Sequence, residues 1–442
     1  MKLHLTAPPN QLLKSAIQIT GSKSESNRSL LLKALYSNVS IENLSNSDDA
    51  EVMQKGLQVE NGAVDIHHAG TAMRFLTGYF ASQEGKEVTL TGSQRMTERP
   101  VQVLVEALRS LGADIAYEKS EGYPPLRIKG KKLVKNQVSL PANISSQYIS
   151  SLLLIAPTLE NGLELELVGK ITSIPYIKMT LGLLSQLGIE NSFEGNQIKV
   201  SPKIKVEPTT LLVESDWSSA SYYYSILALC EIGSEIKLSS YKKNSLQGDS
   251  VLAEIYEKLG VTTLFTGNSI LLKKTGIPGA ATQKAEIPEP EALEPEALEP
   301  ETLEPEVPAL SAAEGLNLDL SNAPDLAQTI AVTCFGLGIS CHLTGLHTLK
   351  IKETDRLEAL HTELTKLGAD ISVTDTSLTL HPSASMKKDI GIDTYNDHRM
   401  AMAFAPLALK TSLIVNDAEV VSKSYPDFWE DLQKLGFGIR EM

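Results

Sequence analysis

Five segments of the chain share one pattern, in which an amphipathic run ends in Leu-Gly. They lie at residues 107–114, 183–190, 255–262, 363–370 and 431–438. A glycine just past the last apolar turn of a helix adopts the left-handed conformation without a Cβ clash, and the residues that follow favour strands. We therefore expect helix–glycine–strand units whose helices are capped by Gly112, Gly188, Gly260, Gly368 and Gly436. A weaker sixth copy is expected around Gly56.

The spacing of these glycines predicts two lobes. Successive glycines are 76, 72, 108 and 68 residues apart, and the long gap contains an unusual insert at 284–308. Without the insert, the period is about 70 residues, longer than the 20–50 residues of solenoid repeats. Six α/β units of this size favour two globular lobes of three units each, with a cleft between them. The alternative interpretation is that Leu-Gly marks any helix end.

The insert also dominates the charge of the chain. From Glu286 to Pro308 it holds nine Glu, six Pro and no Lys or Arg, whereas the whole chain has a net charge of −14. Like charges and proline favour a solvated, extended loop, and we interpret the segment as a tolerated insertion rather than a catalytic part. The remaining charge of about −5 argues against a general nucleic-acid surface but allows a local basic pocket for a small anion.

The N-terminal residues, the apolar runs and the cysteines of the chain indicate its compartment. The N-terminal residues lack the apolar core of a signal peptide, and the longest apolar runs fall far short of the roughly 20 residues of a membrane helix. Three cysteines without CxxC spacing, Cys230, Cys334 and Cys341, predict neither a disulfide framework nor a zinc site. We expect a soluble protein of the reducing cytoplasm.

Two segments of the first half have the features of anion sites. In 20–36, Gly21, Lys23 and Arg28 stand among serines at the start of an apolar helix, where charge, helix dipole and free N–H groups coincide. In 68–81, Gly70 opens a second buried helix, and Arg99 precedes a third. Neither segment matches the nucleotide-binding Walker loop. The alternatives are an ordinary capped helix and structural salt bridges.

The second half carries a denser group of charges. Lys352, Glu353 and Arg356 would share a face if their segment is helical, and two cations at that spacing make most sense around a carboxylate or a bound anion. Alternatively, Glu353 satisfies the cations internally. Further along, Asp397, His398 and Arg399 head a continuous apolar run that predicts a buried helix with its polar end in a cleft. Asp325 stands at the start of another apolar helix, and Lys423 in a turn before the last helix.

Nine motifs closely resemble those of the enolpyruvyl transferase family, in its EPSP synthase branch. They occur in order along almost the whole chain: GSKSESNR, AGTAMR, ERP, SSQY, SIPY, APDLAQT, KETDR, NDHRMAMA and SKSYPDF. The resemblance implies an α/β fold described as an inside-out α/β barrel, with three βαβαββ units in each of two lobes. It places the N-terminal lobe at 21–214 and the C-terminal lobe at 1–20 and 215–442, so that the chain crosses between lobes near Thr20 and Glu214.

The resemblance also implies two anionic substrates, shikimate 3-phosphate and phosphoenolpyruvate. The positions that match shikimate 3-phosphate ligands are Lys23, Ser24, Arg28, Ser145, Ser146, Gln147, Ser173, Tyr176, Asp325 and Lys352. The positions that match phosphoenolpyruvate ligands are Lys23, Gly70, Arg99, Gln147, Arg356, Arg399 and Lys423. Two polyanions repel each other, which accounts for the number of cations, and correct positioning can lower a barrier by roughly 7–11 kcal/mol.

The implied reaction is an addition followed by an elimination, which needs a base and an acid. Asp325 matches the base for the 5-hydroxyl of shikimate 3-phosphate, and Glu353 matches the proton donor to C3 of phosphoenolpyruvate. Lys352 and Arg356 should however keep Glu353 ionised, so either the substrate anions reverse that effect or Lys23 is the donor. Lys23 and Lys423 would stabilise the departing phosphate.

Two other functions remain open at this point. The sister enzyme UDP-N-acetylglucosamine 1-carboxyvinyltransferase carries a cysteine in a mobile loop of its first half, whereas the first cysteine here is Cys230. A noncatalytic polyanion-binding relative should have lost Asp325, Glu353 or Lys23, and all three are present. We expect no metal or organic cofactor and no nucleic-acid or membrane partner, and we expect a monomer.

Overall fold

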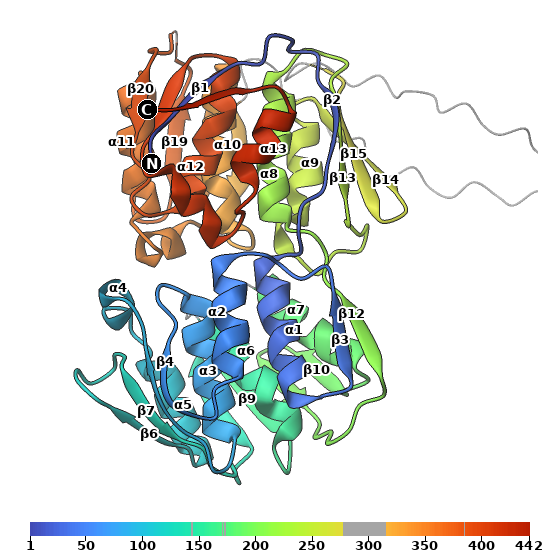
Figure 1. The fold of residues 1–442 in the computed structure, drawn as a ribbon, viewed down its shortest axis with the longest axis vertical. Coiled ribbons are helices and arrows are strands. Elements are labelled where there is room, and N and C mark those ends of the chain that lie inside the picture. The colour runs from blue at the N-terminus through green and yellow to red at the C-terminus, as the bar shows by residue number, and fades with distance from the viewer. Residues whose placement is uncertain (143–144, 170, 172–173, 277–314, 384) are drawn as a thin grey trace, which may run out of the picture.

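The computed structural model describes the 442 residues except 143–144, 170, 172–173, 277–314 and 384. The chain forms two lobes, one above the other in Figure 1, with both termini in the upper lobe. The insert expected at 284–308 and the site residue Ser173 lie outside the described residues. Within the described part of the chain, no helix is long and apolar enough to cross a membrane.

The lower lobe is built from the first half of the chain. Its strands are β3 (Val39–Glu42), β4 (Asn61–Asp65), β5 (Glu87–Thr91), β6 (Asp114–Tyr117), β7 (Leu126–Lys129), β8 (Gln137–Pro141), β9 (Leu163–Val168), β10 (Asn191–Glu194), β11 (Gln197–Val200) and β12 (Thr209–Leu212). Its helices are α1 (Lys23–Leu35), α2 (Asp48–Leu57), α3 (Gly70–Ser82), α4 (Gln94–Thr97), α5 (Gln102–Leu111), α6 (Ser146–Ile155), the 3₁₀ turn η1 (Ala156–Thr158) and α7 (Ile174–Gln186).

The upper lobe combines the first strands with the second half of the chain. Its strands are β1 (Leu3–Thr6), β2 (Lys14–Ile17), β13 (Glu235–Ser239), β14 (Val261–Thr266), β15 (Ser269–Lys274), β16 (Leu316–Asp319), β17 (Cys341–Thr344), β18 (Asp370–Val373), β19 (Leu378–His381), β20 (Ile390–Ile392), β21 (Leu413–Val415) and β22 (Gly438–Glu441). Its α-helices are α8 (Trp217–Leu229), α9 (Leu252–Glu257), α10 (Ala327–Leu337), α11 (Arg356–Leu367), α12 (His398–Phe404) and α13 (Phe428–Lys434). Its 3₁₀ turns are η2 (Gly248–Val251), η3 (Pro324–Leu326), η4 (His347–Ile351), η5 (Ala405–Leu409) and η6 (Ala418–Lys423).

One sheet pattern recurs through both lobes. In the unit β4–α3–β5–α5–β6–β7, β4 and β5 are parallel, and β7 pairs antiparallel with both β5 and β6. The sheets β10-β11-β9-β8, β14-β15-β13-β2, β16-β17-β19-β18 and β20-β21-β1-β22 have the same arrangement. The sixth sheet of the described residues contains only the parallel pair β12 and β3. Strands β1 and β2 thus complete sheets of the upper lobe.

Each lobe has its own hydrophobic core with the helices inside. One core runs from Leu30 to Leu211, and the other combines residues from Leu3 to Ile19 with residues from Trp217 to Phe437. Helices α3, α8, α10 and α12 are buried over nearly their whole length, which leaves the sheets to form the outer layer. The cores agree with lobe boundaries between residues 19 and 30 and between 211 and 217, while the predicted boundary residues themselves stay a prediction.

The glycine pattern is confirmed at five positions and wrong at the sixth. The glycines that end α5, α7, α9, α11 and α13 all have positive φ, from +68° to +112°. Gly56 instead lies inside α2, where a Cβ atom would come within 2.6 Å of Leu76 Cδ1 on α3. This glycine therefore serves the close packing of two helices and caps neither of them.

The two crossings between the lobes lie side by side. Gly21 and Ser215 form an isolated antiparallel bridge, and Ser22 N donates to Glu214 O at 2.7 Å. A Cβ atom on Gly21 would come within 1.9 Å of Asn43 O, so only glycine fits at this crossing. The junction places the start of α1, with Lys23, directly beside the upper lobe.

Candidate active site

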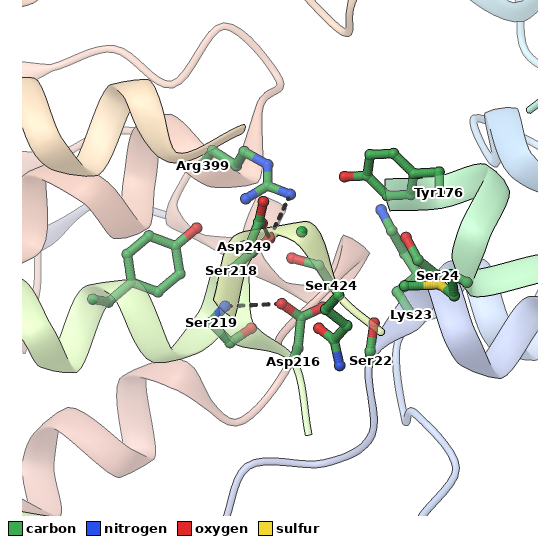
Figure 2. A pocket seen from close by; sticks show the side chains of 14 residues that line it. Ser22, Lys23, Ser24, Tyr176, Asp216, Ser218, Ser219, Asp249, Arg399 and Ser424 are labelled. Carbon is green, nitrogen blue, oxygen red and sulfur yellow. Dashed lines mark hydrogen bonds between the residues drawn. The ribbon is translucent and has the colours of Figure 1, made fainter. Parts of the chain in front are cut away.

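A pocket between the lobes is lined by residues of both. Ser22, Lys23 and Ser24 at the start of α1 face Asp216 and Ser218 at the start of α8, as Figure 2 shows. Tyr176 on α7 and Arg399 on α12 lie on opposite sides of the same space. Helix N-termini carry partial positive charge and free N–H groups, so their meeting at one place favours anions.

Asp325 is the carboxylate around which three cations of the upper lobe gather. Its Oδ1 lies 2.8 Å from Arg356 Nη1 and 3.5 Å from Lys352 Nζ, and its Oδ2 lies 3.1 Å from Arg399 Nη2. Burial alone would raise the pKa of Asp325, but Arg399, Lys352 and Arg356 outweigh burial and hold this pKa well below its ordinary value. The carboxyl group is therefore ionised and in the form that accepts a proton.

Arg356 connects Asp325 to two further carboxylates. Its Nε donates to Asp397 Oδ2 at 2.6 Å, and its Nη2 donates to Glu353 Oε2 at 2.8 Å. The side chain is only 2% exposed, and burial opposes its charge, but the three carboxylates raise its pKa. In this arrangement each of the three nitrogens of Arg356 has a carboxylate partner.

Glu353 faces cations of both lobes. Burial would raise its pKa, but Arg356 and the cations Lys23 and Arg99 of the lower lobe hold the pKa well below its ordinary value. His398 is buried, and neither ring nitrogen has a hydrogen-bond partner among the described residues. Burial together with Lys23 and Arg399 lowers the pKa of His398 well below its usual range, which keeps the ring neutral.

Two lysines meet across the cleft. Lys23 Nζ lies 3.4 Å from Asp49 Oδ2 on α2, and Lys423 Nζ donates to Asn396 O at 2.6 Å. Burial lowers the pKa of Lys423, although Glu353, Asp397 and Asp49 oppose the shift. Lys23 and Lys423 are close enough to affect each other's field.

The lobes are also joined beside these lysines. Ser422 Oγ of the upper lobe donates to Asp48 Oδ2 on α2 at 2.6 Å. Asn46 Nδ2 donates to Asp427 Oδ2 at 2.7 Å. The two bonds flank Lys423 and hold η6 against the start of α2.

Arg99 and Gly70 lie together on the lower lobe. A Cβ atom on Gly70 would come within 2.8 Å of Arg99 Nη1, so the glycine makes room for the guanidinium at the start of α3. Gln147 on α6 reaches the same helix start, because its Nε2 donates to Thr71 Oγ1 at 3.1 Å. Ser145 caps α6 by accepting from Gln147 N, and Ser146 follows it.

Arg28 is placed differently from the other predicted ligands. It is buried, and its guanidinium donates to Thr180 Oγ1, Ser150 Oγ and the carbonyl oxygens of Ser24 and Tyr176. Burial lowers its pKa to about 10, so it remains charged. In this structure Arg28 holds the backbone of Ser24 and Tyr176 in place from behind, and direct contact with a substrate stays a prediction.

The helical geometry expected around Lys352 is not observed. Lys352 is extended, and helix α11 begins only at Arg356, where Asp355 accepts from Leu357 N and Glu358 N. Lys352 and Arg356 converge all the same, because both reach Asp325. The interpretation that Glu353 satisfies both cations internally is confirmed for Arg356 but not for Lys352, which pairs with Asp325.

Sequence reasoning left several site residues without a role. Asp49, Asp397, His398, Ser218 and Asp249 all lie in or beside the cleft. The acidic pair at the start of α2 and the NDHR motif were visible signals for the first three. Nothing in the local sequence marks Ser218 or Asp249, since their partners are distant in the chain.

Comparisons with known proteins agree on one family. The family model EPSP synthase (3-phosphoshikimate 1-carboxyvinyltransferase) matches residues 56–432. A 3-phosphoshikimate 1-carboxyvinyltransferase of Bacteroides fragilis is 44% identical over 442 residues, which cover 99% of this chain and 98% of the relative. One of Haemophilus influenzae is 32% identical over 465 aligned positions, with 98% of each chain covered.

Solved structures agree with the fold. An EPSP synthase from Acinetobacter baumannii has a TM-score of 0.76 at 20% identity, with 100% of both chains covered. The enolpyruvyl transferase NikO from Streptomyces tendae has a TM-score of 0.70 at 13% identity, with 100% of this chain and 99% of that chain covered. The repeated units, the cation-lined cleft and these matches lead to one conclusion: the chain belongs to the EPSP synthase family.

Proposed function

We propose that the cleft transfers the enolpyruvyl group of phosphoenolpyruvate to the 5-hydroxyl of shikimate 3-phosphate, giving 5-enolpyruvylshikimate 3-phosphate and phosphate. This is a step of the shikimate pathway toward chorismate and the aromatic amino acids. The supporting observation is that Lys23 and Arg99 of one lobe lie near Glu353 of the other, beside Asp325 and its three cations. Two polyanions repel each other, so they can be held close together only where several cations surround them.

The two substrates divide the cleft between them in this proposal. Shikimate 3-phosphate takes the hydroxyls and cations near the start of α1, α6 and α7, together with Asp325 and Lys352. Phosphoenolpyruvate is bound by the cations Arg99, Arg399 and Lys423. Lys23 and Gln147 serve both substrates in this proposal.

Asp325 is the proposed base. It accepts the proton of the 5-hydroxyl while that oxygen bonds to C2 of phosphoenolpyruvate and C3 receives a proton. The resulting tetrahedral ketal then loses a C3 proton and expels phosphate, which leaves the enol ether. The low pKa of Asp325 supports an ionised acceptor, and the lysines Lys23 and Lys423 are suited to stabilise the phosphate that departs.

The proton donor to C3 is either Glu353 or Lys23. The free protein holds Glu353 ionised, so Glu353 can donate only after the substrate anions have raised its pKa. Exchange of the C3 hydrogens with deuterated solvent during turnover separates the two. If C3 exchange is lost in Glu353→Gln and kept in Lys23→Arg, Glu353 is the proton donor. The reverse pattern identifies Lys23 as the donor.

The proposed reaction is tested by following the two products together. Purified protein with both substrates should form vinyl protons of an enol ether and inorganic phosphate in equal amounts, measured by ¹H and ³¹P NMR. A protein that binds shikimate 3-phosphate but forms neither product would instead be a noncatalytic polyanion-binding relative.

We further propose a cytoplasmic monomer with lobes at 21–214 and at 1–20 plus 215–442. The continuity of each core across its lobe supports these boundaries. Sedimentation velocity of the full chain tests the monomer.

A further inference from the structure

Among the described residues, the Arg399 side chain makes its two hydrogen bonds through one nitrogen. Its Nη2 donates to Asp325 Oδ2 at 3.1 Å and to Ser218 Oγ at 3.3 Å. Its Nε is buried and has no partner among the described residues. The anchoring bonds thus leave the rest of the guanidinium for a bound anion, provided that Nη2 stays in place.

The second anchor, Ser218, is itself held by a buried acid. The Ser218 hydroxyl donates its single proton to Asp249 Oδ2, so a lone pair of Oγ is turned toward Arg399. Asp249 lies in η2, is 5% exposed and has no part in the proposed reaction. These contacts link Asp249 through Ser218 to Arg399 (Figure 2). The Nη2 bond to Asp325 extends the series to the proposed base.

The hydrogen bonds that link Asp249, Ser218 and Arg399 depend on whether Asp249 is ionised. Burial and the nearby Asp325 raise the pKa of Asp249 to about 6, against the effects of Arg399 and the Ser218 hydroxyl, and Asp216 adds to the increase. The carboxyl group is therefore mainly ionised at neutral pH. A protonated or amide side chain there would no longer fix the direction of the Ser218 proton.

We propose that Asp249 and Ser218 are positioning residues that orient Arg399 for phosphoenolpyruvate. Asp249 fixes the Ser218 hydroxyl, the hydroxyl holds Nη2, and the remaining N–H groups of Arg399 are directed to the anion. This inference rests on the proposed function, in which Arg399 binds phosphoenolpyruvate. It predicts that substitution of either residue lowers the affinity for phosphoenolpyruvate and leaves kcat nearly unchanged.

The test compares Ser218→Ala, Ser218→Thr and Asp249→Asn in the full chain. Ser218→Ala and Asp249→Asn are each expected to raise KM for phosphoenolpyruvate about tenfold, the effect of losing one charge-assisted hydrogen bond. KM for shikimate 3-phosphate and kcat should stay within about twofold. Ser218→Thr keeps the hydroxyl and should remain within about threefold of the wild type in every constant. The double variant should be no worse than the worse single variant, because both act through one contact.

Ser221→Ala is the matched control. Its hydroxyl lies on the same helix but donates to Ser218 O and contacts Thr329, so its removal should leave KM for phosphoenolpyruvate unchanged. The inference is overturned by an unchanged KM in Ser218→Ala, by equal rises for both substrates, or by an additive double variant. Should Asp249→Asn fail to fold, the comparison of Ser218→Ala with Ser218→Thr decides alone. A wild type that forms no product refutes the proposed function, whereas an active wild type with unaffected variants refutes only this inference.

Discussion

Asp325 Oδ1 accepts a hydrogen bond from Arg356 Nη1 at 2.8 Å, so the proposed base and a buried guanidinium form one ion pair in the free protein. Arg356 is held in turn by Asp397 and Glu353, which fixes its position before any substrate binds. The proposed base and Glu353, one of the two candidate proton donors, are therefore organised around one arginine. Without the Asp325 carboxylate, Arg356 would still be paired with Asp397 and Glu353.

Asp325→Asn tests this role of the carboxylate. The amide keeps the shape of the side chain but cannot take the proton of the 5-hydroxyl, so we expect kcat to fall by roughly 10²–10⁴-fold. The dissociation constant of shikimate 3-phosphate, measured by calorimetry, should change much less. Unchanged turnover combined with a large loss of this affinity would show that Asp325 is a ligand and not the base.

Arg99→Ala should mainly weaken phosphoenolpyruvate binding. Arg99 is half-buried beside Gly70 and contributes to the field at Glu353. The loss of its charge-assisted hydrogen bonds should cost about 1.5–3 kcal/mol each, seen as a higher KM for phosphoenolpyruvate. Arg95→Ala is the control, since Arg95 is exposed and paired with Glu98 at 3.3 Å. Equal effects of the two substitutions would argue that Arg99 acts only through general surface charge.

The pH dependence of stability should report on Glu25, which is buried at the crossing between the lobes. Burial raises the pKa of Glu25 to about 7 from 4.5, although Lys242 opposes the increase. The folded state thus binds more protons than the unfolded state between these values, so the free energy of unfolding should fall as pH rises from about 4.5 to 7. Glu25→Gln removes this cost, which can reach about 3 kcal/mol.

The stability gain of Glu25→Gln over the wild type should therefore be larger at pH 8 than at pH 5. Urea unfolding of both proteins at the two pH values measures the difference. An equal difference in the free energy of unfolding between the two proteins at both pH values would mean that Glu25 is not protonated preferentially in the folded protein.

The elements that were predictable from sequence depend on local chemistry. Leu-Gly at a helix end was enough to locate five left-handed caps, because a positive φ strongly favours glycine. At Gly56 the same residue type serves a different need, the contact with Leu76 of another helix. One sequence does not distinguish a glycine required by its own backbone from one required by a neighbour.

The interior of the site was less predictable, because its contacts join residues far apart in the chain. Arg356 and Asp397 are 41 positions apart, and Arg399 and Ser218 are 181 apart. The motifs contained Lys352, Arg356 and Arg399, which the structure brings together at Asp325. They did not show that Arg356 is surrounded by carboxylates or that Arg28 is buried behind the pocket. Such details depend on how both lobes pack, which no local pattern encodes.

Deleting the acidic insert tests its interpretation as a tolerated loop. Glu286 to Pro308 lies outside the described residues and carries nine glutamates in a repeating pattern. A chain without this segment should keep its kcat and both KM values within about twofold, since loop length changes loop-closure free energy only slightly. Loss of activity in a deletion variant that still folds would give the insert a role in function.

Phosphate release from phosphoenolpyruvate tests the central claim most directly, when it is measured in parallel with shikimate 3-phosphate and with UDP-N-acetylglucosamine as the acceptor. We predict rapid release with shikimate 3-phosphate and none above background with UDP-N-acetylglucosamine. Release with the nucleotide sugar alone, or with neither acceptor, would contradict the account.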